Sequence, residues 1–210
     1  MKTAPQTIVI DVDKGSRVAK YTVASGKALM YFFIQGLSND ATRAITITLG
    51  RESALAVYGL AIGSGDQKLR TDLSIIHVKP GARSHVILKG VFTDTAQGVL
   101  NGTILIRPSA QKTDTRLEER VLLLSPDAYA ETIPNLEILA DDVKASHAAA
   151  IGRISEEEIF YLQSRGIERK AAQRMIVHAF LGSIVAHLSD EKVRAKLEAL
   201  LRKKIAHLNV

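Results

Sequence analysis

The chain of 210 residues contains no cysteine and no tryptophan. Without cysteine it can form no disulfide and offers no thiolate, either as a nucleophile or as a metal ligand. Long hydrophobic runs are missing too, because the apolar stretches at 28–34 and 54–62 are far shorter than the roughly 18–20 residues of a membrane-spanning helix. The first residues lead into no apolar signal segment. These absences predict a cytoplasmic protein that makes no membrane contact.

Hydrophobic residues make up 46% of the chain and charged residues 24%. Because that apolar fraction is too high for a disordered chain, we expect a folded protein with a buried core. The formal net charge is +6, shared equally between residues 1–154 and 155–210. The one basic triplet, at 202–204, has no aromatic neighbours on which bases could stack. The charge distribution therefore favours a solvated surface over a nucleic-acid site.

Turn residues are concentrated in residues 1–154, which hold all five prolines and twelve of the fourteen glycines. This part is a series of short β-branched apolar runs, and in one of them Ile45, Ile47 and Leu49 alternate with smaller or polar residues, as in a half-buried strand. Strands at such spacing are typical of a sandwich, a barrel or a β-solenoid, and periodicity does not choose among these. No strict repeat is visible, which argues against a regular solenoid.

A helical period replaces the strands in residues 155–210. Ser155 and Glu158 have the spacing of a capping box, which predicts a helix that ends near Gly166. We therefore expect two domains, a β-rich one at 1–154 and a helical one at 155–210.

Two longer helices should follow in the helical part. The first, from about 168 to 188, is apolar around much of its circumference and is expected to be buried. Ser189 and Asp190 should cap the second. The apolar residues on which these predictions depend are Met175, Ile176, Phe180, Leu181, Ile184 and Val185 in the first helix, and Val193, Leu197, Leu200, Leu201 and Ile205 in the second.

Motifs of common catalytic sites are missing. The only Gly-Lys pair, at 26–27, has Tyr21 in place of the first glycine of a phosphate-binding loop, which excludes a P-loop nucleotidase. There is no G-x-S-x-G elbow. The Ser-His pairs at 84–85 and 146–147 would point to opposite faces of a strand, so neither forms a nucleophile–base pair.

One histidine, His147, has a spacing that suggests a role. Val143, Ala145 and His147 would share one strand face, with Asp141 and Asp142 just before them. In an extended segment Asp141 would lie about 20 Å from His147, at ~3.3 Å per residue. Spacing alone leaves open whether His147 is a metal ligand, a proton carrier or a packed core residue.

Several ordered blocks within roughly residues 85–185 carry a family resemblance. They lie at 89–92, 98–102, 110–114, 122–125, 134–138, 140–147 (Ala-Asp-Asp-Val-Lys-Ala-Ser-His) and 158–167. In this order they resemble the SufB/SufD family of iron–sulfur cluster assembly proteins, and in detail the SufD branch more than SufB.

The resemblance implies a mainly β fold, a right-handed β-helix followed by about three helices. It implies a scaffold subunit, not an enzyme, that pairs with SufB or with a second copy of itself in a dimer. Its C-terminal helices would bind an ABC-type ATPase, SufC. The histidine that is implicated at the SufB–SufD interface of the family falls on His147, which is therefore the expected metal ligand for a transient interface cluster.

The chain departs from the family pattern in three ways. Ala145 stands where SufD proteins often carry a cysteine, the cluster-building cysteine of SufB is absent, and the chain is short, without the usual N-terminal helical region. Since an iron–sulfur cluster needs about four ligands, mostly thiolates, we expect no cofactor to be bound stably by this chain alone. The alternative is a basic β-rich module that binds nucleic acid or another polyanion, which salt-dependent binding would reveal.

Overall fold

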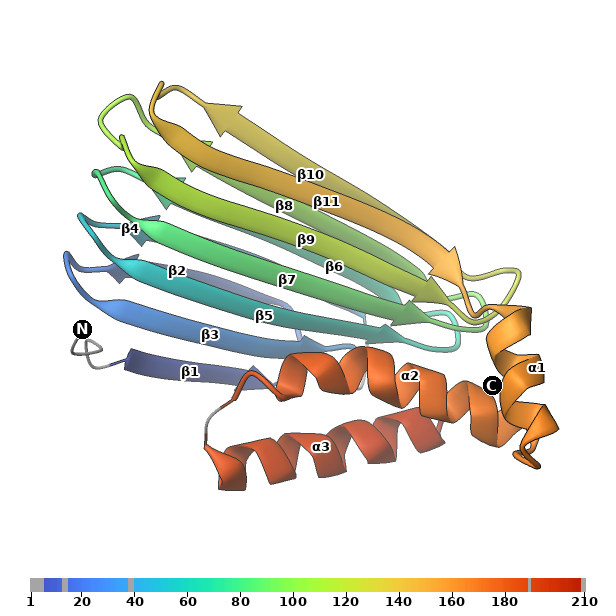
Figure 1. The fold of residues 1–210 in the computed structure, drawn as a ribbon. Helices are drawn as coiled ribbons and strands as arrows, with labels where there is room; N and C mark the ends of the chain where they lie inside the picture. Colours follow the sequence, from blue (N-terminus) through green and yellow to red (C-terminus); the bar gives the residue numbers. More distant parts are fainter. Residues whose placement is uncertain (1–5, 13–14, 38–39, 189, 209–210) are drawn as a thin grey trace.

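The computed structural model describes residues 6–12, 15–37, 40–188 and 190–208, which form eleven strands followed by three helices (Figure 1). The strands are β1 (Gln6–Val12), β2 (Arg17–Val23), β3 (Ala28–Gln35), β4 (Ala41–Leu49), β5 (Ala54–Gly63), β6 (Lys68–His77), β7 (Arg83–Phe92), β8 (Gln97–Ile106), β9 (Thr113–Leu123), β10 (Tyr129–Ile138) and β11 (Val143–Arg153). The helices are α1 (Glu156–Ser164), α2 (Arg169–Val185) and α3 (Glu191–Ala206).

Consecutive strands alternate between two parallel sheets. The odd-numbered strands form one sheet in the order β1-β3-β5-β7-β9-β11, and the even-numbered strands form the other in the order β2-β4-β6-β8-β10. The chain therefore winds as a β-solenoid of about 5 turns (Figure 1). The predicted fold class is confirmed, and the solenoid is the alternative that periodicity had left open.

The turns of the solenoid differ in length, and the first is the shortest. Thr7 pairs with Leu29, a step of 22 residues, whereas Leu117 pairs with His147, a step of 30 residues. Because the step changes from turn to turn, no fixed repeat can appear in the sequence. The inference that a missing repeat argues against a solenoid is therefore wrong. Stacking requires only that the strands pair in register, and the segments that connect them can differ in length from turn to turn.

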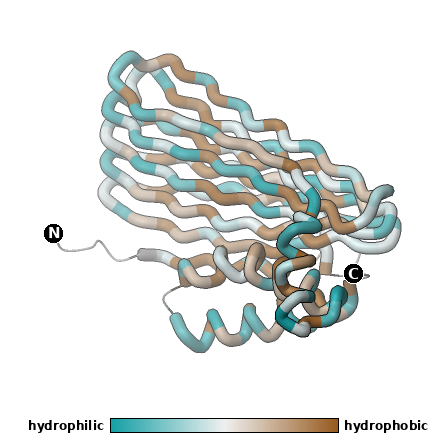
Figure 2. The backbone as a smooth tube through the Cα atoms, turned by 45° about the vertical axis from the view of Figure 1, so that its right-hand side comes forward, coloured by the Kyte–Doolittle hydropathy of each residue, from teal (hydrophilic) through white to brown (hydrophobic). Residues whose placement is uncertain are grey.

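Inward-facing side chains from both sheets fill the inside of the solenoid. In β4, Ile45, Ile47 and Leu49 are buried, as their alternation predicts. Figure 2 shows hydrophobic and hydrophilic positions alternating along the strands. Each buried aliphatic side chain of this kind contributes about 1.5–3 kcal/mol to folding, so the stacked rows of the core hold the turns together.

A second apolar cluster joins α2 and α3 to the outer face of the odd-numbered sheet. The strands β3 and β5 are buried on both faces, which explains why they read as continuous apolar runs. The outward side chains are Met30, Phe32 and Ile34 of β3, Tyr58, Leu60 and Ile62 of β5, and Val91 of β7, and the helices contribute Val177, Leu181, Ile184, Val185, Leu197, Leu201 and Ile205.

The helix ends follow the predicted capping signals. The hydroxyl of Ser155 accepts a hydrogen bond from the backbone amide of Glu158 at 3.4 Å, and Gly166 after α1 has a φ of 83°. Asp190 caps α3 through its side chain. Ser189, predicted to share this cap, lies outside the described residues.

The prediction that the second helix is buried holds for one side of α2 only. Val177 and Leu181 face the sheet and are buried, whereas Met175 is 50% exposed. The helix pair packs on a single sheet face, and within the described part of the chain no element covers Met175 on the opposite side of α2. None of the helices that the structure describes is long and apolar enough to cross a membrane.

Candidate functional site

The solenoid ends in an open turn formed by β10 and β11. Each is the last strand of its sheet: β10 pairs with β8 and β11 with β9, and within the described residues no strand pairs with their other edges. Figure 1 shows this end of the stack opposite the end where α2 and α3 lie. An uncapped strand edge presents backbone amides and carbonyls that a further strand can pair with.

Apolar side chains are exposed at the same end. Ile138 closes β10 and Ile151 lies near the end of β11, and both are 43% exposed. Their register partners one turn earlier, Ile106 and Val121, are buried. The open turn therefore presents core-type positions to solvent, which is typical of a surface that another chain covers.

His147 lies on the inward-facing side of β11. It pairs with Leu117 of β9, which is buried in the core, yet His147 itself is exposed because no later described strand covers it. Val143 and Ala145 share its face, as predicted, and are partly buried. The ring nitrogens of His147 form no hydrogen bond or ion pair with the described residues, so the structure leaves the imidazole available.

The two aspartates before β11 do not join His147. Asp141 and Asp142 are both exposed, and Asp142 is held through its backbone, whose carbonyl accepts a hydrogen bond from the amide of Lys112 at 2.6 Å. Among the residues that the structure describes, no three histidine or carboxylate side chains gather in a way that could hold a metal ion. Any metal bound at His147 would need donors from elsewhere.

A buried carboxylate that sequence reasoning missed lies one turn below the open end. Glu119 of β9 faces inward, is 0% exposed, and has no side-chain partner for its carboxylate among the described residues. Burial raises its pKa to about 7, against a smaller opposing effect of the Gly102 backbone. A Cβ atom on Gly102 would lie 2.6 Å from Oε1 of Glu119, so the glycine makes room for the carboxylate. The available signal was a glutamate at a core position of an alternating strand.

The structure also pairs a serine with a histidine seven residues earlier, at the corner between β6 and β7. Ser84 faces inward and makes a 2.9 Å hydrogen bond to Nε2 of His77, and its hydroxyl is also hydrogen-bonded to Thr115. His77 is 0% and Ser84 5% exposed, so no substrate can reach the pair. Burial lowers the pKa of His77 to about 4, which keeps the ring neutral. This hydrogen-bond chain is part of the core and not a catalytic pair.

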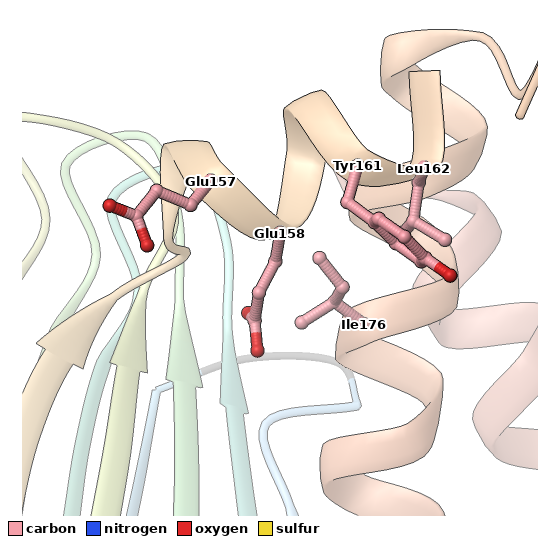
Figure 3. A pocket seen from close by; sticks show the side chains of 5 residues that line it. All are labelled: Glu157, Glu158, Tyr161, Leu162 and Ile176. Carbon is pink, nitrogen blue, oxygen red and sulfur yellow. The ribbon is translucent and has the colours of Figure 1, made fainter. Parts of the chain in front are cut away.

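A shallow hollow of about 400 Å³ lies between α1 and α2 (Figure 3). Glu157, Glu158, Tyr161 and Leu162 line it from α1, and Ile176 lines it from α2. Beside it the α1 surface is aromatic: Phe160 is 73% and Tyr161 58% exposed. Exposed aromatic side chains next to a hollow are typical of helix surfaces that bind a partner.

Basic side chains on the outer face of β9 are compensated locally. Arg116 and Arg120 form ion pairs with Glu118 at 2.7 and 3.4 Å, and His85 lies 3.9 Å from the same carboxylate. Charges arranged in this way give a solvated surface and not a continuous basic track for a polyanion.

Comparison with known proteins identifies one family. The family described as "SUF system FeS cluster assembly, SufBD core domain" matches residues 6–180. The iron–sulfur cluster assembly protein SufD of Escherichia coli is 36% identical over 156 residues, which cover 74% of this chain and 37% of the relative. SufD of Bacillus subtilis is 34% identical over 179 residues, covering 81% and 40%. A SufBD family protein of Mycobacterium leprae is 34% identical over 192 residues, covering 80% and 49%. The chain thus spans less than half the length of these relatives.

Proposed function

The chain belongs to the SufBD core family of the SUF system for iron–sulfur cluster assembly, and from that membership we propose that it is a non-catalytic scaffold subunit that acts with a partner chain. The observation that carries this proposal is the open end of the solenoid, where His147 stands between exposed apolar residues and two unpaired strand edges.

Partner binding at this end follows from the physical chemistry of the last turn. Strand addition to β10 or β11 would satisfy their edge backbone groups, and it would cover Ile138 and Ile151. The partner is a SufB-like chain or a second copy of this chain, since both would present a solenoid end of matching shape. A two-fold arrangement of two identical ends is self-complementary.

His147 supplies the metal-binding side chain in this proposal. An iron–sulfur cluster, here the cargo of the scaffold, needs about four protein ligands that are mostly thiolates. This chain has no cysteine and one available imidazole at the open end, so it contributes a nitrogen ligand and the partner contributes the sulfur ligands. The cluster is bound only while both chains are together.

The helices provide the second interaction surface. Tyr161 of α1 lines the hollow of Figure 3 and is 58% exposed, and its neighbour in sequence, Phe160, is 73% exposed. An apolar helix surface with no covering element among the described residues suits helix-in-groove binding. We assign this surface to an ABC-type ATPase of the SufC kind.

The test is reconstitution of the complex with SufB-like and SufC-like proteins, followed by iron and sulfide determination and visible absorption. The wild-type chain should be retained in the complex and support cluster formation. His147→Ala should leave the melting temperature and partner binding unchanged, because the side chain is exposed, but should reduce the iron content per complex. A variant that is retained and carries iron and sulfide at the wild-type level would contradict the role of His147. A wild-type chain that binds only nucleic acid, in a salt-dependent manner, would contradict the scaffold function itself.

A further inference from the structure

Glu119 differs from the other carboxylate buried inside the solenoid. Asp11 of β1 and Glu119 of β9 occupy the same inward-facing row of the odd-numbered sheet, connected by register through Phe33, Gly59 and Leu88.

The two carboxylates have different surroundings. Asp11 accepts a 2.7 Å hydrogen bond from the hydroxyl of Tyr31 and forms ion pairs with Arg17 and Arg43. Glu119 is more deeply buried, and no described side chain forms a hydrogen bond or an ion pair with it. Because an unpaired carboxylate inside a core opposes folding, the structural surroundings supply no reason for a glutamate at position 119.

The position of Glu119 relative to the open end gives a reason for a glutamate at this position. Leu117 pairs with His147, and Glu119 pairs with Ala149. Glu119 and His147 therefore both face inward on neighbouring strands, with their register positions two residues apart. With strands about 4.8 Å apart and a rise of ~3.3 Å per residue, their Cα atoms lie roughly 8 Å apart. Side chains of this length can bring a carboxylate oxygen and an imidazole nitrogen to one ion across that separation.

The residue that lies over Glu119 toward the open end is small. Ala149 contributes only a methyl group on the inward face of β11, and Ala145 on the other side of His147 does the same. The carboxylate rests against Gly102 of β8. Rotation about its side-chain bonds therefore turns it toward the open end without displacing a large side chain of β11.

We propose that Glu119 and His147 form half of a binding site for a divalent iron ion, at the open end of the solenoid, which donor atoms of a partner chain complete. Oxygen and imidazole nitrogen form a suitable ligand pair for Fe(II). The charge of the ion compensates the buried carboxylate, which no described side chain does. The inference rests on the proposed function and names the residue that would receive its iron cargo.

The test uses Co(II) as a spectroscopic probe and anaerobic Fe(II) as the second metal, added to the full chain alone and to its complex with a SufB-like partner. Glu119→Gln keeps the size of the side chain and removes the anionic ligand, and His147→Ala removes the imidazole. Glu118→Gln is the matched control, because this neighbouring carboxylate faces outward and pairs with Arg116. Glu119→Gln should fold at least as well as the wild type, since it removes an unpaired buried acid.

We expect Glu119→Gln and His147→Ala each to weaken Co(II) binding by at least about tenfold and to change its visible spectrum, with Glu118→Gln at the wild-type level. A Glu119→Gln variant with wild-type affinity and spectrum would overturn the half-site. Partner capture is measured on the same samples: normal capture together with unchanged metal binding refutes the half-site alone. Absence of capture by the wild type refutes the scaffold function, and the titration of the isolated chain still decides the role of Glu119.

Discussion

Two buried titratable residues, Glu119 and His77, make the stability of the solenoid depend on pH in opposite directions. Burial moves the pKa of Glu119 up to about 7 and that of His77 down to about 4. In both cases burial favours the neutral form of the side chain in the folded protein. The native state is therefore destabilised wherever the unfolded chain ionises and the folded chain does not.

For Glu119 the affected range is neutral and alkaline pH. Below about 4.5 both states carry the proton; as pH rises from there to about 7 the unfolded chain loses it first, and the free energy of unfolding falls. The loss reaches about 3 kcal/mol above pH 7, at 1.36 kcal/mol per pKa unit. Glu119→Gln should remove this loss, so its urea midpoint at pH 8 should exceed that of the wild type and the two should converge near pH 4. A wild-type midpoint with no fall between these pH values would contradict the burial of an unpaired acid.

For His77 the affected range is acidic. Above pH 6.5 the ring is neutral in both states; as pH falls from 6.5 toward about 4 the unfolded chain takes up a proton and stability decreases, by up to about 3 kcal/mol. We expect His77→Gln to flatten this part of the stability curve, measured by urea unfolding between pH 4 and 7. If the free energy of unfolding of the variant falls as steeply between pH 7 and 4 as that of the wild type, the acid destabilisation is due to other groups.

At the residue scale, sequence reasoning succeeds where the relevant neighbours are near in sequence. The alternation of Ile45, Ile47 and Leu49 predicts their burial correctly, and the spacing of Ala145 and His147 predicts their shared face. It fails where a contact depends on register between turns, as for Ser84 with Thr115. Glu119 was missed although its place between Leu117 and Val121 in an alternating strand was the available signal.

At the scale of elements, local sequence signals predict where a helix begins and ends better than they predict which of its residues are buried. The capping residue Ser155 and the glycine at 166 mark the ends of α1, since both act within a few residues. The exposure of Met175 could not be predicted, because it depends on α2 packing against one sheet face only. The same packing makes the helices part of the fold, so deleting them would expose the apolar outer face of β3 and β5.

Point variants on α1 are therefore the better probe of its proposed partner. Phe160→Ala with Tyr161→Ala removes the exposed aromatic surface and touches no buried residue, so the far-ultraviolet circular dichroism and the melting temperature should not change. We expect ATPase association, measured by calorimetry, to weaken by about tenfold or more, as is usual for aromatic hot-spot residues. Val18→Ala on β2, where the side chain is 76% exposed, is the control and should bind normally. Equal affinity of the double variant and the control would exclude this surface.

At the scale of the whole molecule, the solenoid has a flank that α2 and α3 cover and an open end at β10 and β11. The helices cover the outer face of β3 and β5, whereas β10 and β11 end the stack without cover among the described residues (Figures 1 and 2). The family resemblance predicts the solenoid, and periodicity alone does not, because its steps vary between 22 and 32 residues. Which turn ends the stack follows only from the complete register.

Association of the partner chain with two β11 variants tests most directly whether this open end is the interaction surface. Ala149 faces inward at the open end and Ala150 faces outward on the same strand, and both are exposed. We expect Ala149→Lys to reduce binding of a SufB-like partner by at least about tenfold, because a charge would be buried in the interface. Light scattering should show the same loss for self-association, while Ala150→Lys and the wild type remain alike. Equal binding by the wild type and Ala149→Lys would contradict the assignment of the open end as the surface at which this scaffold meets its partner.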